Sequence, residues 1–175
     1  MPELTETVPT LPLRAGIEAH DLAAVVDAFA PDAVVHSPIT GALAFEGHEQ
    51  IGAVFGVILD VFKDIRYTAE LRGEGGAVLI ASAQVDGTHI EIADHMRLDE
   101  HGKISELTVF FRPMPAIAVS ARAIGAGLGR RKSPARARII SMLIRPLIFL
   151  TRTGDGIGAK LVRPTRSFIL RSPAR

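Results

Sequence analysis

One stretch of the chain places apolar side chains on one face of a helix. Residues 47–64 repeat them at spacings of three and four, the period of an α-helix, at Ile51, Val54, Phe55, Ile58, Leu59 and Phe62. Residues 16–30 also predict a helix, with Asp21 as an N-cap and an end before Pro31. The β-rich run at 32–38 then predicts a short strand that Pro38 ends, because proline cannot donate to a ladder.

The middle of the chain is typical of an antiparallel meander. Residues 65–72 and 77–85 flank the sequence GEGG, whose glycines accept positive φ in a hairpin turn, and residues 88–98 and 103–112 flank a second turn, DEHG. Two prolines after residue 112 end the last predicted strand. This order predicts an α+β domain in which the long helix covers one face of a curved antiparallel sheet.

From residue 116 onward the pattern changes. The stretch SARAIGAGLGRRKSPARAR is rich in Gly, Arg and Ala and predicts a linker or a weak helix. Ser133 and Pro134 are typical of an N-cap and a first helical residue, so an amphipathic helix is expected over about 134–150. Pro146 should kink or end that helix. Arginines recur every seven residues and would share a narrow helical stripe; they are Arg131, Arg138, Arg145 and Arg152.

Composition limits the class of protein. The 175 residues are 47% hydrophobic and 22% charged, which supplies a core and excludes disorder throughout. The chain has no cysteine, which excludes a disulfide framework, a thiolate zinc site and a cysteine nucleophile. The longest apolar stretch, 139–150, is interrupted by Arg145 and Pro146 and is shorter than the roughly 20 residues that cross a bilayer.

Charge divides the chain into two parts. Residues 1–115 hold 7 Lys and Arg against 18 Asp and Glu, a net charge of −11, whereas residues 116–175 hold 13 against 1, a net charge of +12. We therefore expect an acidic domain over 1–115 and a basic tail with a different role. The tail has several open interpretations: contact of residues 131–152 with an anionic membrane surface, packing on the domain or a second subunit, nonspecific nucleic-acid binding, or disorder.

Strand 88–98 places a carboxylate among apolar side chains. Because successive side chains point to opposite faces, Asp94 shares its face with Ile90, Ile92, Met96 and Leu98. Burial raises the pKa of a carboxyl by up to about 3–5 units, and a protonated carboxyl in an apolar pocket stabilises a developing oxyanion. In the alternative interpretation, Asp94 lies near a rim, accepts hydrogen bonds and has no chemical role.

Three runs carry a family resemblance: DLAAVVDAFAPDAVVHSP, GHEQIGAVF and IADHMRLDEHGKISELTVFFRP. Over roughly residues 13–115 they resemble the SnoaL-like branch of the nuclear transport factor 2-like superfamily, which also includes ketosteroid isomerases, scytalone dehydratases and limonene epoxide hydrolases. The resemblance implies a cystatin-like cone, in which a bent antiparallel sheet surrounds a pocket closed by helices, and a homodimer. It implies no single activity, because this fold hosts enzymes and non-enzymes alike.

The ketosteroid isomerases allow a comparison residue by residue. IADHMRL resembles the strand that carries their protonated oxyanion-binding aspartate, which implies that role for Asp94. Their general-base aspartate corresponds to Ser37, and their oxyanion tyrosine falls near Leu13, so steroid isomerisation by that mechanism is not expected. His36 is the nearest other base, since an imidazole pKa of about 6.5 suits proton transfer, although alternation points it away from Ser37.

Two functions remain open. The first is a pocket protein that binds a small hydrophobic or alicyclic molecule and performs isomerase, dehydratase, cyclase or hydrolase chemistry with catalytic candidates Asp94, His36 and Ser37. The second is a non-catalytic ligand-binding or dimerisation module with a membrane-surface tail. No metal or cofactor is expected, sequence-specific nucleic-acid binding is not expected, and the expected location is cytoplasmic or peripheral at a membrane. Strand parity and the long helix predict the ligand-binding side chains Phe55, Leu59, Tyr67, Ile92, Met96, Leu107, Val109 and Phe111.

Overall fold

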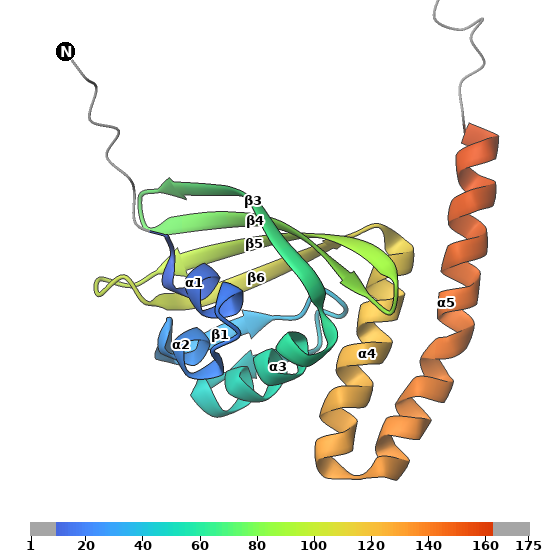
Figure 1. Ribbon diagram of the computed structural model, residues 1–175, viewed down its shortest axis with the longest axis horizontal. Coiled ribbons are helices and arrows are strands. Elements are labelled where there is room, and N and C mark those ends of the chain that lie inside the picture. Colours follow the sequence, from blue (N-terminus) through green and yellow to red (C-terminus); the bar gives the residue numbers. More distant parts are fainter. Residues whose placement is uncertain (1–9, 163–175) are drawn as a thin grey trace, which may run out of the picture.

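The computed structural model describes residues 10–162, with side chains described as far as residue 154. Its six strands form one curved, unclosed sheet in the order β2-β1-β6-β5-β4-β3, with helices beneath it and at one end (Figure 1). Neighbouring strands are antiparallel except β1 and β6, which run parallel. The strands are β1 (Phe29–His36), β2 (Ala44–Glu46), β3 (Lys63–Gly73), β4 (Gly76–Val85), β5 (Thr88–Leu98) and β6 (Ile104–Arg112).

The four strands expected after residue 64 form the meander β3–β6, and the α+β assignment is confirmed. A two-residue turn, Asp86 and Gly87, joins β4 to β5, and both residues have positive φ, 48° and 70°, as tight hairpins require. A tight turn fixes the register, and the register decides which side chains face the core. Leu79, Asp94 and Val109 consequently lie directly opposite one another on β4, β5 and β6.

Three helices lie below the sheet in the view of Figure 1: α1 (Pro12–Glu18), α2 (Leu22–Asp27) and α3 (Gly47–Val61). Asp21 caps α2 as predicted, because its carboxylate accepts two backbone hydrogen bonds at 2.9 and 3.0 Å. This region is more divided than the helix expected over 16–30, since β1 begins at Phe29 and Pro31 lies within the strand. The β1–β6 register shifts between Phe29 and Val34, so the exposed proline occupies an irregular part of the ladder.

The stretch that suggested a linker or a weak helix is a packed helix, α4 (Met114–Lys132), with eleven buried residues. It runs past one end of the cone and contacts α3, β4, β5 and β6 (Figure 1). Glycines permit this close approach: a Cβ on Gly127 would lie 2.3 Å from Val57 of α3, and one on Gly125 would lie 2.9 Å from Ile140 of the next helix. Tertiary packing therefore overrides the low helix propensity of glycine.

The final helix, α5 (Pro134–Val162), runs back along α4 and extends beyond the predicted end near residue 150. Ser133 caps it as predicted, with its Oγ accepting a hydrogen bond from the Arg136 backbone N at 3.3 Å. The helix continues through Pro146, which is exposed, so the carbonyl that loses its partner can bond to water. Because the chain reverses at Ser133, Arg131 belongs to α4, and the predicted arginine stripe consists of Arg138, Arg145 and Arg152.

No helix within the described residues has the length and the apolar character needed to cross a membrane.

Candidate functional site

Asp94 lies at the middle of β5 with its side chain turned into the interior of the cone, as the alternation of that strand predicts. The residue is 9% exposed, and its direct cross-strand neighbours are Leu79 and Val109. Across the described part of the chain, no hydrogen bond or ion pair to its carboxyl is found, and burial alone perturbs its ionisation. A buried carboxyl without a partner is uncommon in a folded protein, because unpaired charge is costly to desolvate.

Burial raises the pKa of Asp94 from an ordinary value of 3.8 to about 7. Near neutral pH, a large fraction of this carboxyl is therefore protonated and carries an O–H donor. Such a group can donate a hydrogen bond to a ligand oxygen or transfer its proton to that oxygen. The environment thus gives a single aspartate the properties of a weak acid at the pH of most cells.

The Asp94 carboxyl faces a small cavity of about 50 Å³, the inner cavity, which has room for only one or two water-sized groups. Apart from Asp94 and Tyr67, the side chains around it are apolar. The lining consists of Ile17, Phe55, Ile58, Phe62, Ile65, Tyr67, Ala81, Ile92, Asp94, Val109 and Phe111.

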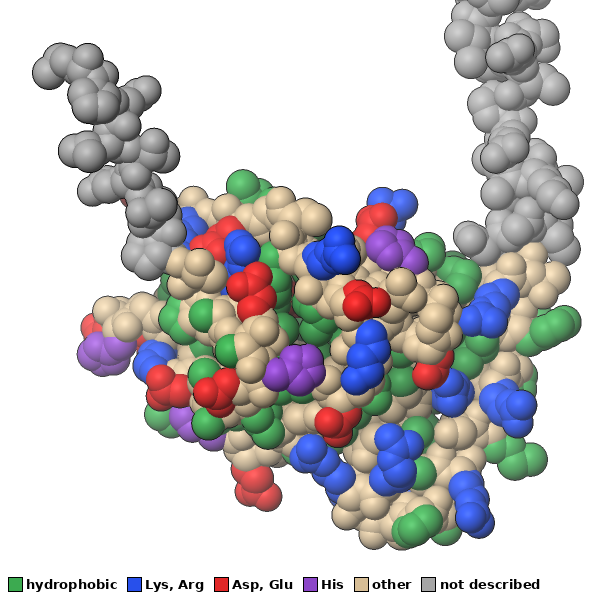
Figure 2. All heavy atoms as spheres, in the orientation of Figure 1, with side chains coloured by type: hydrophobic (Ala, Val, Ile, Leu, Met, Phe, Trp, Pro, Cys, Tyr) green, Lys and Arg blue, Asp and Glu red, His purple; other side chains and the backbone are tan. Residues whose placement is uncertain are grey.

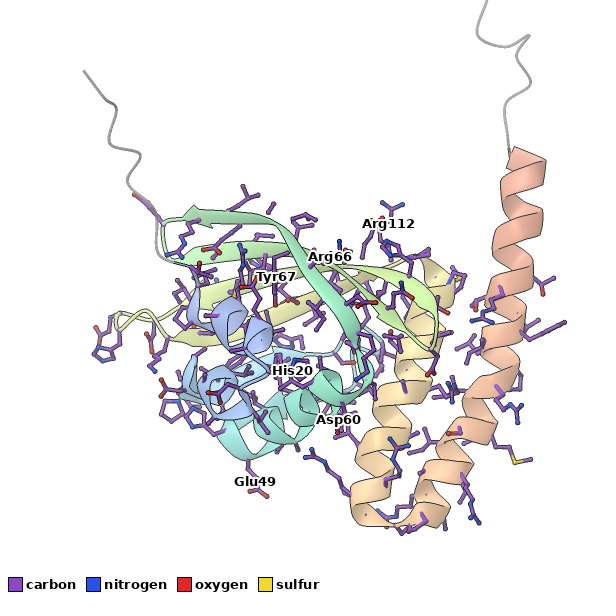
Figure 3. The ribbon with its side chains drawn as sticks, in the orientation of Figure 1. His20, Glu49, Asp60, Arg66, Tyr67 and Arg112 are labelled. Atoms are coloured by element: carbon purple, nitrogen blue, oxygen red, sulfur yellow. The ribbon has the colours of Figure 1, made fainter. Side chains whose placement is uncertain are left out.

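Tyr67 supplies the second polar group of the inner cavity. It lies on β3, between the sheet and α1 (Figure 3), and the register aligns it with Ala81, Ile92 and Phe111 in one row across four strands. Burial, and then the negative charge of Asp94, raises the pKa of the Tyr67 phenol, which stays a neutral hydroxyl. The guanidinium of Arg14 lies 5.3 Å from the centroid of the tyrosine ring and holds that ring from the α1 side.

A second apolar cavity of about 180 Å³, the outer cavity, adjoins the inner one. The two share four lining side chains, Phe55, Ile58, Val109 and Phe111, and the Phe111 ring also contacts Phe62 with a centroid distance of 5.9 Å. The outer cavity also has walls from the β1–β2 loop and from both C-terminal helices. Its other lining residues are Val35, Ser37, Pro38, Ile39, Thr40, Leu43, Phe45, Val54, Ala121, Ile124, Gly125, Leu128, Ile140 and Ile144.

The eight predicted ligand-binding side chains fall into two groups. Five of them line a cavity: Tyr67 and Ile92 face the inner one, and Phe55, Val109 and Phe111 face both. The other three, Leu59, Met96 and Leu107, are buried in the core and line neither cavity. Strand parity correctly places Met96 and Leu107 on an interior face, but there they are fully buried among other core side chains.

The structure does not bring His36 or Ser37 to Asp94. His36 is exposed, and its Nε2 lies 3.1 Å from Oε1 of Glu106 on the neighbouring strand. Ser37 lines the outer cavity, where its Oγ accepts a hydrogen bond from the Ile39 backbone N at 3.2 Å. The catalytic roles of these two residues stay predictions, and in this geometry neither touches the inner cavity.

Sequence reasoning missed the contribution of α4 and α5 to the outer cavity. The amphipathic pattern over 134–150 predicts an apolar helical side, but it could not show that Ile140 and Ile144 cover the outer cavity. Ala121, Ile124 and Gly125 come from the glycine- and alanine-rich stretch, in which no periodic signal stands out. The only available signal was the small size of the side chains, because small residues in a helix let a neighbouring helix approach closely and form such a wall.

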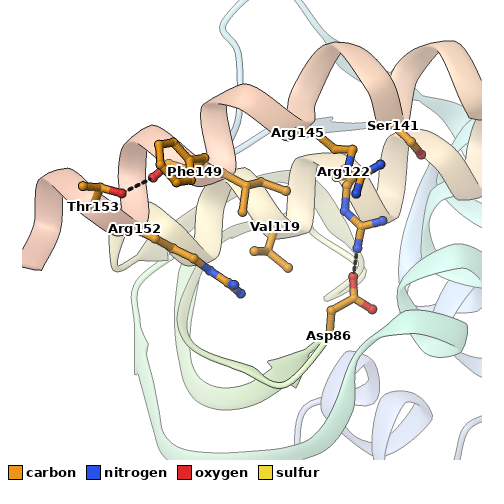
Figure 4. Close-up of a pocket in the computed structure, with 9 residues that line it drawn as sticks. Asp86, Val119, Arg122, Ser141, Arg145, Phe149, Arg152 and Thr153 are labelled. Carbon is orange, nitrogen blue, oxygen red and sulfur yellow. Dashed lines mark hydrogen bonds and ion pairs between the residues drawn. The ribbon is translucent and has the colours of Figure 1, made fainter.

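A third hollow is larger but lies outside the cone, between α4, α5 and the β4–β5 turn (Figure 4). It measures about 810 Å³, is open to solvent and is lined by three arginines, Arg122, Arg145 and Arg152. Arg122 forms an ion pair with Asp86, and Arg152 donates a hydrogen bond to the Thr88 hydroxyl at 2.8 Å. This cleft shares no lining residue with the inner cavity, so it belongs to the helix surface rather than to the candidate site.

Comparison with known proteins agrees with this fold. The SnoaL-like domain profile matches residues 13–107. A steroid delta-isomerase from Pseudomonas aeruginosa is 28% identical, with a TM-score of 0.59, over 71% of this chain and 88% of that chain. A cystatin-like-fold protein from Silicibacter pomeroyi is 21% identical, with a TM-score of 0.61, over 73% and 90% of the two chains. No curated protein matches the sequence. The resemblance and the cystatin-like fold are both confirmed.

Proposed function

The chain belongs to the SnoaL-like domain family, and on that basis we propose that it binds a small, mostly apolar ring molecule and performs acid–base chemistry on it with Asp94. The observation that carries this proposal is the partnerless carboxyl at the inner cavity, whose pKa burial raises to about 7. An apolar cavity with a few convergent polar groups and a perturbed titratable group is typical of a ligand site.

The cavity volumes indicate the size of the ligand. Sites for drug-sized molecules measure about 300–1,000 Å³, whereas an apolar cavity of about 150 Å³ binds benzene. The outer cavity, at about 180 Å³, therefore suits a molecule with a single ring, and the inner cavity accepts only the polar end of such a molecule. In this arrangement the ring lies among Phe55, Val109 and Phe111, and an oxygen substituent reaches Asp94.

The polar groups at the inner cavity favour reactions that need one acid. Protonated Asp94 donates a hydrogen bond to a carbonyl, hydroxyl or epoxide oxygen, and this bond strengthens as negative charge develops on the oxygen. The neutral Tyr67 hydroxyl is a second donor. Since the described lining holds no other carboxylate and no imidazole, we favour dehydration, cyclisation or hydrolysis, in which Asp94 protonates a substrate oxygen, over a shuttle between two carboxylates. The isomerase named among the similar structures keeps isomerisation as a further candidate.

Carbonyl-labelled 2-cyclohexenone is a suitable probe, because its carbon-13 shift moves downfield when the oxygen accepts a hydrogen bond. We expect the bound probe to show this displacement below pH 7 and to lose it as the pH rises and Asp94 ionises. The Asp94→Leu variant should lose the pH-dependent part of the displacement and keep only what the Tyr67 hydroxyl supplies, and Asp94→Asn should keep a weaker displacement that does not change with pH. The matched control is Asp60→Asn, at an exposed carboxylate of α3. No binding, or a displacement unaffected by Asp94→Leu, would contradict the proposal.

Binding without catalysis is the second candidate, and the lack of a second carboxylate and of an imidazole in the described lining favours it. The two candidates differ in proton transfer. We expect a catalyst to accelerate the exchange of cyclohexenone ring protons with deuterium oxide above the rate in buffer, and Asp94→Asn to abolish the acceleration. A protein that binds the probe and leaves the exchange rate unchanged does not catalyse its enolisation, and that result favours the binding module over an isomerase.

A further inference from the structure

The surface of α5 that points away from α4 is apolar and uncovered. Six of the eleven exposed large hydrophobic side chains in the described structure lie on this one helix. Five of them follow a single helical stripe at spacings of three and four residues, and their exposure runs from 49% to 77%. They are Ile139, Met142, Leu143, Leu147 and Leu150, and we call this set the outer stripe.

Packing within the chain does not account for the outer stripe. The opposite side of α5 already faces α4 and the outer cavity, where Ile140 and Ile144 form part of the wall. An ordinary amphipathic helix shows polar side chains on its free face, whereas α5 is apolar on both sides. A contiguous exposed apolar surface of this kind marks an interaction site.

Basic residues run along one edge of the outer stripe. Arg138, Arg145 and Arg152 follow the same line at intervals of seven residues, and each of them lines a groove between α5 and α4. Figure 4 shows Arg145 and Arg152 at one of these grooves. Within the described side chains, neither Arg138 nor Arg145 forms an ion pair with a carboxylate. Residues 116–175 contain a single acidic residue, Asp155, against 13 basic ones, so this edge carries positive charge without compensation from its own part of the chain.

An anionic lipid surface matches both features at once. The apolar side chains of an interfacial helix enter the boundary between headgroups and acyl chains, while arginines at its edge meet lipid phosphates. A second copy of this chain would bring two uncompensated arginine rows to one interface, where like charges repel. From the outer stripe and the arginine row, we propose that α5 docks the protein on an anionic phospholipid membrane.

The charge of the cone sets the orientation in this docking. Residues 1–115 carry a net charge of −11, and acidic side chains appear over the cone while basic ones gather over α4 and α5 (Figure 2). An anionic surface attracts one end of the molecule and repels the other. The helix therefore lies flat on the membrane, with the cone held on the side that faces the solvent.

Vesicle flotation with the full chain tests the apolar part of this docking. We expect binding to phosphatidylcholine vesicles that contain phosphatidylglycerol. The double variant Leu143→Glu/Leu147→Glu should lower partitioning at least about tenfold, because two apolar side chains leave the interface. The matched control is Leu71→Glu, at an exposed leucine on β3, which should bind like the unmodified protein. All three positions are exposed, and circular dichroism confirms that each variant is folded. Equal binding by the double variant would overturn the proposal.

The same assay tests the charge. Arg138→Gln/Arg145→Gln should lower partitioning about tenfold to thirtyfold at low salt, since each basic residue near an anionic leaflet contributes about a factor of five. High salt should remove most of the difference, and Arg66→Gln on β3 is the matched control. No binding at low salt, or equal binding to vesicles of phosphatidylcholine alone, would overturn docking on an anionic surface. Light scattering that shows a dimer, converted to a monomer by Leu143→Glu/Leu147→Glu, would overturn it in favour of a second copy.

Discussion

The cone and the hairpin of α4 and α5 distribute polar and apolar side chains in opposite ways. The cone encloses one carboxyl, Asp94, in an apolar interior and turns its other charges toward water. The hairpin keeps its arginines at the surface and leaves apolar side chains exposed on α5. The cone therefore holds a chemical group inside an apolar interior, whereas the hairpin directs an uncovered apolar surface outward.

The two regions differ in charge, yet they share a wall. The outer cavity lies between cone residues such as Phe111 and hairpin residues such as Ile124 and Ile144. Helix α4 packs against α3 and the sheet on one side and against α5 on the other. A boundary drawn by charge after residue 115 consequently passes through a packed interface.

The largest expected effect is on stability, and two truncations of the chain measure it. Ending the chain after Pro115 removes α4 and exposes the surface that it covers; the buried side chains of Val119 and Ile124 alone account for about 4 kcal/mol, at about 2 kcal/mol each. Ending it after Lys132 keeps α4 and removes only α5. In urea denaturation followed by circular dichroism, we expect the longer product to unfold cooperatively and the shorter one to unfold at much lower urea concentration or to lack a transition.

Equal midpoints for the two products would contradict this expectation. That result would mean that residues 1–115 fold without α4 and that the boundary predicted from charge is also a boundary of stability.

The second largest expected effect is a pH dependence of the free energy of unfolding, which comes from Asp94, the buried acid of the cone. The pKa of Asp94 is about 7 in the folded protein and 3.8 as its ordinary value, so between these limits the folded state binds more protons than the unfolded state. The free energy of unfolding therefore falls as pH rises from about 4 to 7 and is level above that. At about 1.36 kcal/mol per pKa unit, the loss between pH 5 and pH 8 is about 3 kcal/mol.

Asp94→Asn should lack this loss, so the difference in unfolding free energy between the variant and the unmodified protein measures the contribution of Asp94 directly. Asp60→Asn, at an exposed carboxylate, should follow the pH dependence of the unmodified protein. Parallel curves for Asp94→Asn and the unmodified protein would show that the carboxyl is hydrated in solution, and the candidate site would lose its acid.

The sequence predicted the strands and the long helix of the cone well because these elements have a hydrophobic period, whereas the cone itself was implied by the family resemblance. Alternation in 88–98 places Asp94 inside, and the spacing in 47–64 places Phe55 at both cavities. The same rules fail where local geometry decides. Pro31 was expected after a helix and lies in an irregular strand, and parity could not distinguish Phe111, at the cavities, from Leu107, in the solid core.

The hairpin was harder to predict because its signal is size rather than period. Glycine and alanine have no strong hydrophobic pattern, so α4 resembled a linker, and the outer cavity wall at Ala121 and Gly125 could not be inferred. Whether two helices approach closely depends on the surface of the partner, which a single stretch of sequence does not contain. Propensity alone therefore understated the structure of this region.

The smallest expected effect is on the stability of two glycine variants of the hairpin. It tests whether small residues account for the close packing of α4. A Cβ at Gly127 would lie 2.3 Å from a methyl of Val57, whereas a Cβ at Gly154 on α5 would meet nothing within 4 Å. Gly127→Ala should destabilise the protein by about 1–3 kcal/mol through overpacking against α3, and Gly154→Ala should be neutral or stabilise it by up to about 1 kcal/mol through helix propensity. Urea denaturation measures both. If both substitutions stabilise the protein equally, α4 is a helix that tolerates side chains toward α3, and the glycines do not account for its close packing on the cone.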